Sequence, residues 1–196
     1  MVSYVFDKIL QSSNRPANQA QARDWFRDQA DSIRSNQVTP NRLMGGNKSA
    51  LMTKLLPGRM FMFTYNPKLK DKLPYYDTFP LCIPIDLDSN SFLGLNLHYL
   101  PPLLRAKMMD ALWNVTEGKS SMDEKTKIGA SYEVMKGISG LKPYKACIKR
   151  YLYSNVTSRF LFIEPEKWDI ALMLPTQRFQ KASINTVYKD SRRLSK

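Results

Sequence analysis

The stretch RMFMFTY, residues 59–65, is the clearest β-strand pattern of this 196-residue sequence. Its methionines fall on one side of a two-residue alternation and its phenylalanines on the other, which is the period of a pleated strand. The triplet Asn-Pro-Lys at 66–68 follows, and these residues favour a turn. The stretch therefore predicts a strand that ends in a turn, with two rows of large apolar side chains.

Neighbouring segments extend this pattern into a sheet. Residues 78–85 and 92–99 are strand-like and are separated by turn-forming residues at 86–90. Segments 145–153 and 159–163 flank a short polar stretch, which predicts a hairpin. We therefore expect about five strands of mainly antiparallel character.

Helices are expected before, between and after the strands. Helical spacing or a helix-start signal occurs at residues 20–33, 101–112, 122–135 and 165–174. Residues 35–50 are rich in Asn, Gln, Gly and Pro, which predicts a loop between the first helix and the strands. The fold class is accordingly α+β, with a small mainly antiparallel sheet or a partly closed barrel of the SH3 type.

The chain is long enough for one domain with its own core. We expect an N-terminal helix and linker arm over 1–50, an α+β core over 51–179, and a basic tail over 180–196. The tail carries five Lys or Arg and one Asp. Such a terminus usually stays mobile until it meets its partner.

The charge balance is the first indication of function. Thirty Lys and Arg against seventeen Asp and Glu leave a formal net charge of +13. Repulsion of this size is offset by a polyanion or by an acidic protein surface, and charge alone leaves both open. No apolar run approaches the length of a membrane span, and no secretory signal is evident. Cys82 and Cys147 lie in apolar runs, which predicts buried free thiols in a reducing compartment.

The sequence offers little for catalysis. Its single histidine, His98, lies in a strand-like run and is expected to be packed and hydrogen-bonded. Asp86 and Asp88 belong to a predicted turn, and Glu164 precedes a helix start, so both acidic groups have structural roles there. We therefore predict no enzyme, no metal and no cofactor.

Three basic segments are candidates for contact with phosphates. Their residues are Arg59, Lys68, Lys70 and Lys72 around the first turn, Lys145, Lys149 and Arg150 in the strand-like stretch, and Arg192 and Arg193 in the tail. Strand alternation would place Lys145, Lys149, Tyr151 and Tyr153 on one face, where an ordinary solvated face is the alternative interpretation. Tyr75 and Tyr76, bracketed by prolines, suit a protein interface as well as a core entry. We expect Tyr75, Tyr76, Tyr151 and Tyr153 to contact partners.

Several strings resemble a family of T-even-type bacteriophage proteins described as DNA end protectors. They are Pro57-Gly58-Arg59-Met60, Tyr65-Asn66-Pro67-Lys68, Leu73-Pro74-Tyr75-Tyr76-Asp77, Phe79-Pro80, FLGLNLHYLP at 92–101, Lys149-Arg150-Tyr151, Trp168-Asp169-Ile170-Ala171, Leu174-Pro175, Phe179 and Ser191-Arg192-Arg193. The resemblance spans roughly residues 55–193, and the first 50 residues carry little of it. It implies a late virion protein that lies with the packaged genome, shields DNA ends from exonuclease, and helps head completion and head-tail joining.

Two hypotheses follow from the residues and the resemblance. The first is a non-catalytic virion protein that binds double-stranded DNA independently of sequence through phosphate contacts. The second is a structural neck, tail or baseplate component that binds acidic virion subunits and not DNA. Neither hypothesis involves a membrane or a small-molecule substrate.

Overall fold

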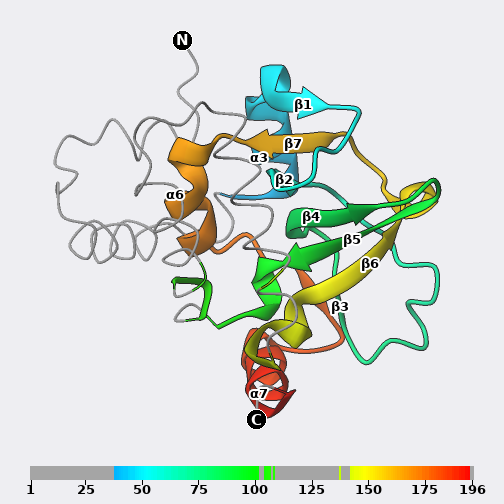
Figure 1. Cartoon of the computed structure of the whole chain (residues 1–196), viewed down its shortest axis with the longest axis vertical. Helices are drawn as coiled ribbons and strands as arrows, with labels where there is room; N and C mark the ends of the chain where they lie inside the picture. Colours follow the sequence, from blue (N-terminus) through cyan, green and yellow to red (C-terminus); the bar gives the residue numbers. More distant parts are fainter. Residues whose placement is uncertain (1–37, 102–103, 107, 109–136, 138–141, 195–196) are drawn as a thin grey trace, which may run out of the picture.

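The computed structural model describes residues 38–101, 104–106, 108, 137 and 142–194. Its centre is a six-stranded antiparallel sheet in the order β1-β7-β2-β4-β5-β6 (Figure 1). The strands are β1 (Leu51–Met52), β2 (Met60–Met62), β4 (Leu81–Leu87), β5 (Ser91–Asn96), β6 (Ile148–Leu152) and β7 (Phe160–Ile163). A separate two-stranded ladder joins β3 (Tyr76–Asp77) to β8 (Phe179–Gln180). The predicted α+β class with a mainly antiparallel sheet is confirmed.

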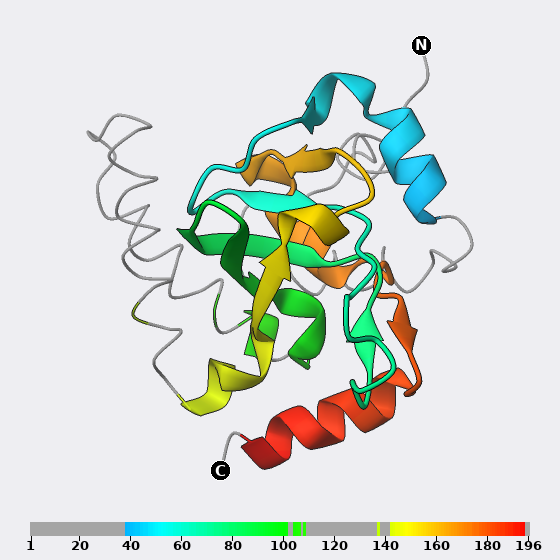
Figure 2. The ribbon, with the colours of Figure 1, turned by 90° about the vertical axis from the view of Figure 1, so that its right-hand side faces the viewer.

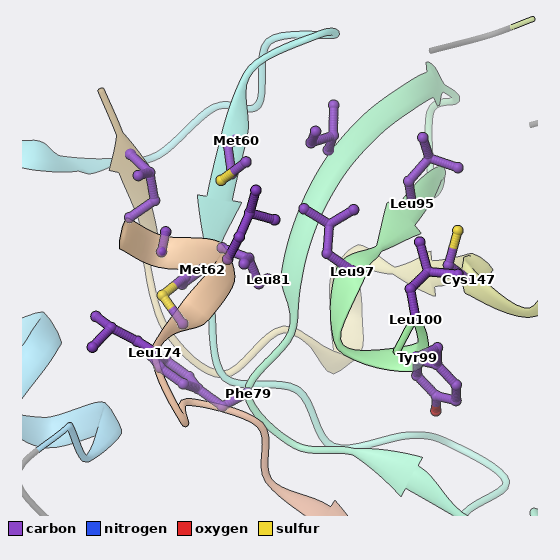
Figure 3. Close-up of a cluster of buried hydrophobic side chains, with 14 of the residues drawn as sticks. Met60, Met62, Phe79, Leu81, Leu95, Leu97, Tyr99, Leu100, Cys147 and Leu174 are labelled. Carbon is purple, nitrogen blue, oxygen red and sulfur yellow. The ribbon is translucent and has the colours of Figure 1, made fainter. Parts of the chain in front are cut away.

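The alternation in β2 places side chains in two different hydrophobic clusters. Met60 and Met62 belong to the larger, mainly aliphatic cluster, where Met62 lies beside helix α6 (Trp168–Met173) (Figure 3). Phe61 and Phe63 belong to a smaller, aromatic cluster on the opposite face. Both faces of the central strand are therefore buried, and the predicted two rows of apolar side chains are confirmed.

The sheet is strongly curled. The rings of Phe63, directly after β2, and Tyr151, in β6, are 5.2 Å apart although β4 and β5 lie between their strands. In a flat sheet the spacing between strands would separate them by about 14 Å. Backbone hydrogen bonds also join Thr157 to Thr64 and Asn66 to Asn155. The curl approaches the expected partly closed shape, but β1 and β6 remain edge strands and no closed barrel forms among the described residues.

The hairpin predicted from 145–153 and 159–163 is wrong. Its first half begins as a 3-10 helix, η3 (Lys142–Cys147), and only Ile148–Leu152 forms a strand. β6 pairs with β5, whereas β7 pairs with β1 and β2 at the other side of the sheet. The 3-10 turn η4 (Tyr153–Asn155) and the residues after it cross from one edge toward the other. Curling of the sheet shortens the path between its two edges. The curl depends on the whole sheet, so the local sequence does not encode which strands pair.

The loop predicted over 35–50 is also wrong in its second half, which forms helix α3 (Pro40–Gly46) and the 3-10 turn η1 (Lys48–Ala50). Thr39 caps α3 by accepting a hydrogen bond from the Arg42 amide at 3.4 Å. Pro40 occupies the first turn, where its missing N–H costs nothing. Leu43 is buried in the larger cluster, so this part of the predicted arm packs against the core.

The predicted mobile tail is instead an ordered helix, α7 (Ile184–Leu194). Val187, Tyr188 and Ser191 are buried, and they recur at the spacing of one helix face. Ser183 accepts a hydrogen bond from the Thr186 amide at 3.2 Å and so caps the first turn. The high charge of residues 180–196 predicted a mobile tail, whereas the amphipathic spacing within the segment forms a helix.

Other predicted helices differ in how far the structure describes them. The helix opened by Pro165 is confirmed as the 3-10 turn η5 (Pro165–Lys167) followed by α6. The helices expected over 20–33 and 122–135 lie outside the described residues, as does most of the one after Pro101. The end of the 92–99 segment is a 3-10 turn, η2 (Leu97–Tyr99), and not strand.

Candidate nucleic-acid interface

One end of the molecule collects exposed cationic side chains from three segments that are distant in sequence. Helix α7 lies at this end and extends from the β3–β8 ladder to η3, which it contacts (Figure 2). The loop at residues 66–75, called here the basic loop, leads into β3. We call the exposed cations of these segments the basic end, namely Lys68, Lys70, Lys72, Lys142, Lys145, Lys181, Lys189, Arg192 and Arg193. Asp71 and Asp190 are the acidic residues of the same segments.

Lys181 holds the basic loop in place. Its ammonium donates to the backbone carbonyls of Lys70 at 2.6 Å, Asp71 at 3.0 Å and Leu73 at 3.2 Å. These carbonyls belong to a single helical turn, in which the Leu73 amide donates to the Leu69 carbonyl at 3.2 Å. The loop is thereby fixed to the residues just before α7, and its lysines are presented from a supported backbone.

The buried guanidinium of Arg105 anchors α7 to the core. It donates to the Leu100 carbonyl at 2.8 Å, the Leu172 carbonyl at 2.8 Å and the Tyr188 hydroxyl at 2.6 Å. Ser191 adds a second anchor, because its hydroxyl donates to the Tyr99 carbonyl at 2.6 Å. These contacts join α7 to α6 and η2 and explain why the C-terminal segment is ordered.

A buried polar network lies behind the basic end. Nδ1 of His98 is 2.6 Å from Oδ2 of Asp77, and Nε2 of His98 is 2.9 Å from the hydroxyl of Thr176. The other carboxylate oxygen of Asp77 accepts from the backbone amides of Phe79 at 3.0 Å and Arg178 at 3.1 Å. The network therefore connects β3, η2 and the segment that leads into β8.

Burial sets the charge of the histidine in this network. Burial lowers the pKa of His98 below its ordinary value, and Asp77 only partly opposes this effect. Burial alone would raise the pKa of Asp77, but the His98 ring and the backbone amides hold it below its ordinary value. A neutral His98 donates from Nδ1 to Asp77 and accepts from Thr176, so both ring nitrogens are satisfied. The predicted packed, hydrogen-bonded His98 is confirmed, whereas its carboxylate partner was missed.

The aspartate, histidine and hydroxyl of this network are in the order found in hydrolase triads, but they lie in the interior. His98 and Thr176 are 0% exposed and Asp77 is 3% exposed. A catalytic hydroxyl must reach its substrate, so this arrangement serves packing. Among the described residues, no three His, Cys, Asp or Glu side chains are grouped to hold a metal ion.

The strand-like basic stretch does not present the face that was predicted. Tyr151 is buried in the aromatic cluster, and of the four residues of the predicted face only Lys149 and Tyr151 lie within β6. The Lys149 ammonium lies 4.0 Å from the centre of the Tyr99 ring, and burial lowers its pKa. Lys149 therefore packs as a cation over an aromatic ring, while Lys145 belongs to η3 and to the basic end.

Arg59 lies apart from the basic end, and Arg150 lies in β6, the strand that follows η3. The Arg59 guanidinium is 5.6 Å from the centre of the Phe162 ring in β7, at the end of the sheet away from α7 (Figure 1). Arg150 is exposed on β6 and donates to the Ser91 hydroxyl at 3.1 Å. The structure thus brings together Lys68, Lys70, Lys72, Lys145, Arg192 and Arg193 from the predicted set.

The tyrosines predicted as an interface are largely packed. Tyr75 is partly buried, with its ring 6.0 Å from that of Tyr99 and 6.4 Å from that of Phe179. Tyr76 is partly buried in β3. Tyr153 lies in η4 with its ring 5.4 Å from that of Phe92. Tyr75 therefore agrees better with the alternative interpretation, in which the Tyr75-Tyr76 segment enters the core.

The family described as Phage T4 terminal DNA protecting protein matches residues 5–192. The chain belongs to this family. Comparisons with curated proteins and with solved structures found no match. The family match includes the N-terminal residues, which carry few of the strings that first suggested the resemblance.

Family membership identifies the chain as a relative of a phage protein that protects terminal DNA. In the part of the chain that the structure describes, no helix is long and apolar enough to cross a membrane. Lys142, Lys181 and Lys189 were not among the cations predicted to contact phosphates. The missed signal is the amphipathic spacing of α7, which forms a helix that packs on the core and contacts η3.

Proposed function

We propose that this chain is a non-catalytic virion protein of a tailed phage that binds double-stranded DNA through the basic end and shields the ends of the packaged genome. The observation that carries the proposal is the concentration of exposed cations in α7, in η3, which α7 contacts, and in the basic loop, which Lys181 ties to the residues just before α7. Membership of a family described as DNA protecting supports it.

The dimensions of the basic end suit a DNA duplex. Helix α7 has 11 residues and is therefore about 16 Å long. Duplex DNA carries one phosphate charge per about 1.7 Å of axis, so about ten charges lie alongside such a helix. Helix α7 itself carries three exposed cations, Lys189, Arg192 and Arg193, and the rest of the basic end adds six more. Contacts of this kind position a protein on the phosphate backbone without reading bases, so binding is independent of sequence.

The proposal includes the place of the protein in the phage. A protein bound to the ends of a packaged genome lies where the filled head is completed and the tail is joined, and we infer that it assists both steps. It would be made in the host cytoplasm and carried in the virion. Docking to acidic head, neck or tail subunits through the same cations is the alternative role of the basic end.

The test compares binding of the full chain to blunt linear duplex and to covalently closed duplex at two salt concentrations. We expect salt-sensitive binding to both forms, with slower exonuclease digestion of the linear form when the protein is bound. A protein of equal positive charge without end-binding activity serves as the control for simple coating of DNA. If neither DNA is bound near physiological salt, the proposal fails and binding to acidic virion subunits becomes the better explanation.

A further inference from the structure

The basic loop exposes two leucines among its lysines. Leu69 is 57% exposed and Leu73 is 37% exposed, so Leu69 is the most exposed large apolar side chain among the described residues. The hydrogen bond from the Leu73 amide to the Leu69 carbonyl closes one helical turn. Residues four apart in such a turn project from the same side. We infer that the two exposed leucines lie on one side of the loop, and we call them the leucine turn.

The residue that holds the backbone of the leucine turn has a strained conformation. Lys181 adopts φ 68°, and it is the only described residue other than glycine with a positive φ. This left-handed conformation costs roughly 1–2 kcal/mol for a residue with a side chain. It accompanies the three hydrogen bonds by which the Lys181 ammonium fixes the carbonyls of the turn. Strain of this kind persists where the surrounding structure enforces a particular arrangement.

The surroundings of the leucine turn indicate an anionic partner with an apolar face. Lys68, Lys70 and Lys72 are exposed and alternate with the leucine positions along the loop. The end of a DNA duplex has this chemistry, because its last base pair exposes one unstacked apolar face between two phosphate strands. Leucine is among the side chains that proteins place against base steps. The interior of a duplex offers only phosphates and groove edges to such a surface, unless bases are unstacked.

We propose that the leucine turn packs against the terminal base pair of a DNA duplex while the lysines beside it contact the terminal phosphates. This inference rests on the proposed function and deepens it, because it names the feature that distinguishes an end from the rest of the duplex. General affinity for DNA resides in the whole basic end. Preference for the end resides in Leu69 and Leu73.

The test uses two DNA probes of equal length and sequence. One is a blunt duplex closed by a hairpin loop at one side, and the other is closed by hairpin loops at both sides. The double variant Leu69→Ala/Leu73→Ala should bind the open-ended probe on the order of ten-fold more weakly than the unaltered chain. Its affinity for the fully closed probe should be unchanged.

Leu87→Ala is the matched control. Leu87 is also 37% exposed, but it lies at the end of β4 between Asp86 and Asp88. This variant should bind both probes like the unaltered chain. Since all three leucines are exposed, the variants should fold, and their thermal unfolding temperatures check this.

A second pair of variants tests the support of the leucine turn. Lys181→Ala removes the hydrogen bonds to the turn together with one charge, whereas Lys189→Ala removes one charge only. The first should reduce the preference for the open end, and the second should weaken binding to both probes equally.

The possible outcomes distinguish failure of the leucine-turn inference from failure of the proposed function. Equal loss on both probes in the double leucine variant overturns the inference and leaves DNA binding intact. No binding of the unaltered chain to either probe overturns the proposed function itself. Binding to vesicles of anionic phospholipid that requires both leucines, without preference for open ends, overturns the inference in favour of a lipid surface.

Discussion

Nδ1 of His98 and Oδ2 of Asp77 lie 2.6 Å apart, and both side chains are shielded from solvent. This contact ties the end of β5, through η2, to the β3–β8 ladder that precedes α7. The same carboxylate oxygen accepts from the Asn96 side-chain amide at 3.3 Å, and that amide also donates to the Tyr151 hydroxyl at 2.9 Å. One buried carboxylate thus connects the sheet, the aromatic cluster and the base of the proposed DNA-binding end.

The His98–Asp77 contact predicts loss of stability on acidification. Burial holds the pKa of His98 below its ordinary 6.5, so below about that pH the unfolded chain binds a proton that the folded chain does not. Stability is therefore complete above that pH and decreases as the pH falls, by at most about 1.4 kcal/mol per pH unit for one proton. Asp77, whose pKa is lowered from 3.8, adds a further loss near and below that value. Urea unfolding between pH 7.5 and about 5 measures the first effect.

The assignment of that effect to His98 can be checked directly. The chain has one histidine, so its ring protons give one set of imidazole NMR signals. These signals should not titrate near 6.5 in the folded chain. A normal titration at that pH would contradict a buried neutral imidazole.

Tyr188→Phe should loosen the attachment of α7. The substitution removes the hydroxyl that accepts from Arg105 at 2.6 Å and leaves a buried guanidinium N–H with one weaker partner, the His98 carbonyl at 3.3 Å. We expect the free energy of unfolding to decrease by about 1–3 kcal/mol. Amide hydrogen exchange within α7 should also become faster. Tyr76→Phe, at a partly exposed ring in β3, is the control, and equal losses in both variants would argue against the anchoring role of Arg105.

Gly94→Ala should destabilise the sheet because the site has no room for a methyl group. A Cβ at this position would clash with Sγ of Cys82 and would lie 3.3 Å from the Ile83 carbonyl oxygen. Overpacking of this kind costs about 1–3 kcal/mol in the free energy of unfolding. The same substitution should cost less in a Cys82→Ala background, which removes the sulfur. Gly45→Ala, with nothing within 4 Å of the added methyl, should be neutral or stabilising.

Neutralising two cations of α7 should change the salt dependence of DNA binding. Lys189 and Arg193 are four residues apart and both exposed. Each phosphate contact contributes about 0.9 to the slope of log affinity against log salt, so Lys189→Ala/Arg193→Ala should reduce that slope by about 1.8. Arg42→Ala/Lys48→Ala removes the same charge from α3 and η1 and should leave the slope nearly unchanged. Identical slopes for the two double variants would show that net charge, and not the basic end, governs binding.

Local patterns were enough to identify most strands. Residues 59–65, 78–85 and 92–99 each overlap an observed strand, because alternation and turn residues act within a few positions. The helix opened by Pro165 is another local success. Burial of His98 and of both cysteines was also predicted from their apolar neighbours.

The predictions that were wrong concern the pairing of strands and the ordered state of the C-terminal segment. The β6–β7 hairpin was wrong because strand neighbours depend on how the whole sheet curls, and adjacency in sequence does not set them. The tail was misjudged because its order comes from Arg105, more than 80 positions before Tyr188 in the chain. Lys149 was chosen for its charge, but packing over Tyr99 gives it another role.

The amino-acid sequence by itself determined the α+β class, the alternating strands, the excess of positive charge and the resemblance that the family comparison confirmed, because these properties depend on composition and on short-range order. Only the tertiary structure decided which cations share a surface. Contacts among η3, α7, Lys181 and the basic loop join residues separated by tens of positions, and charge acts on a partner according to distance in space.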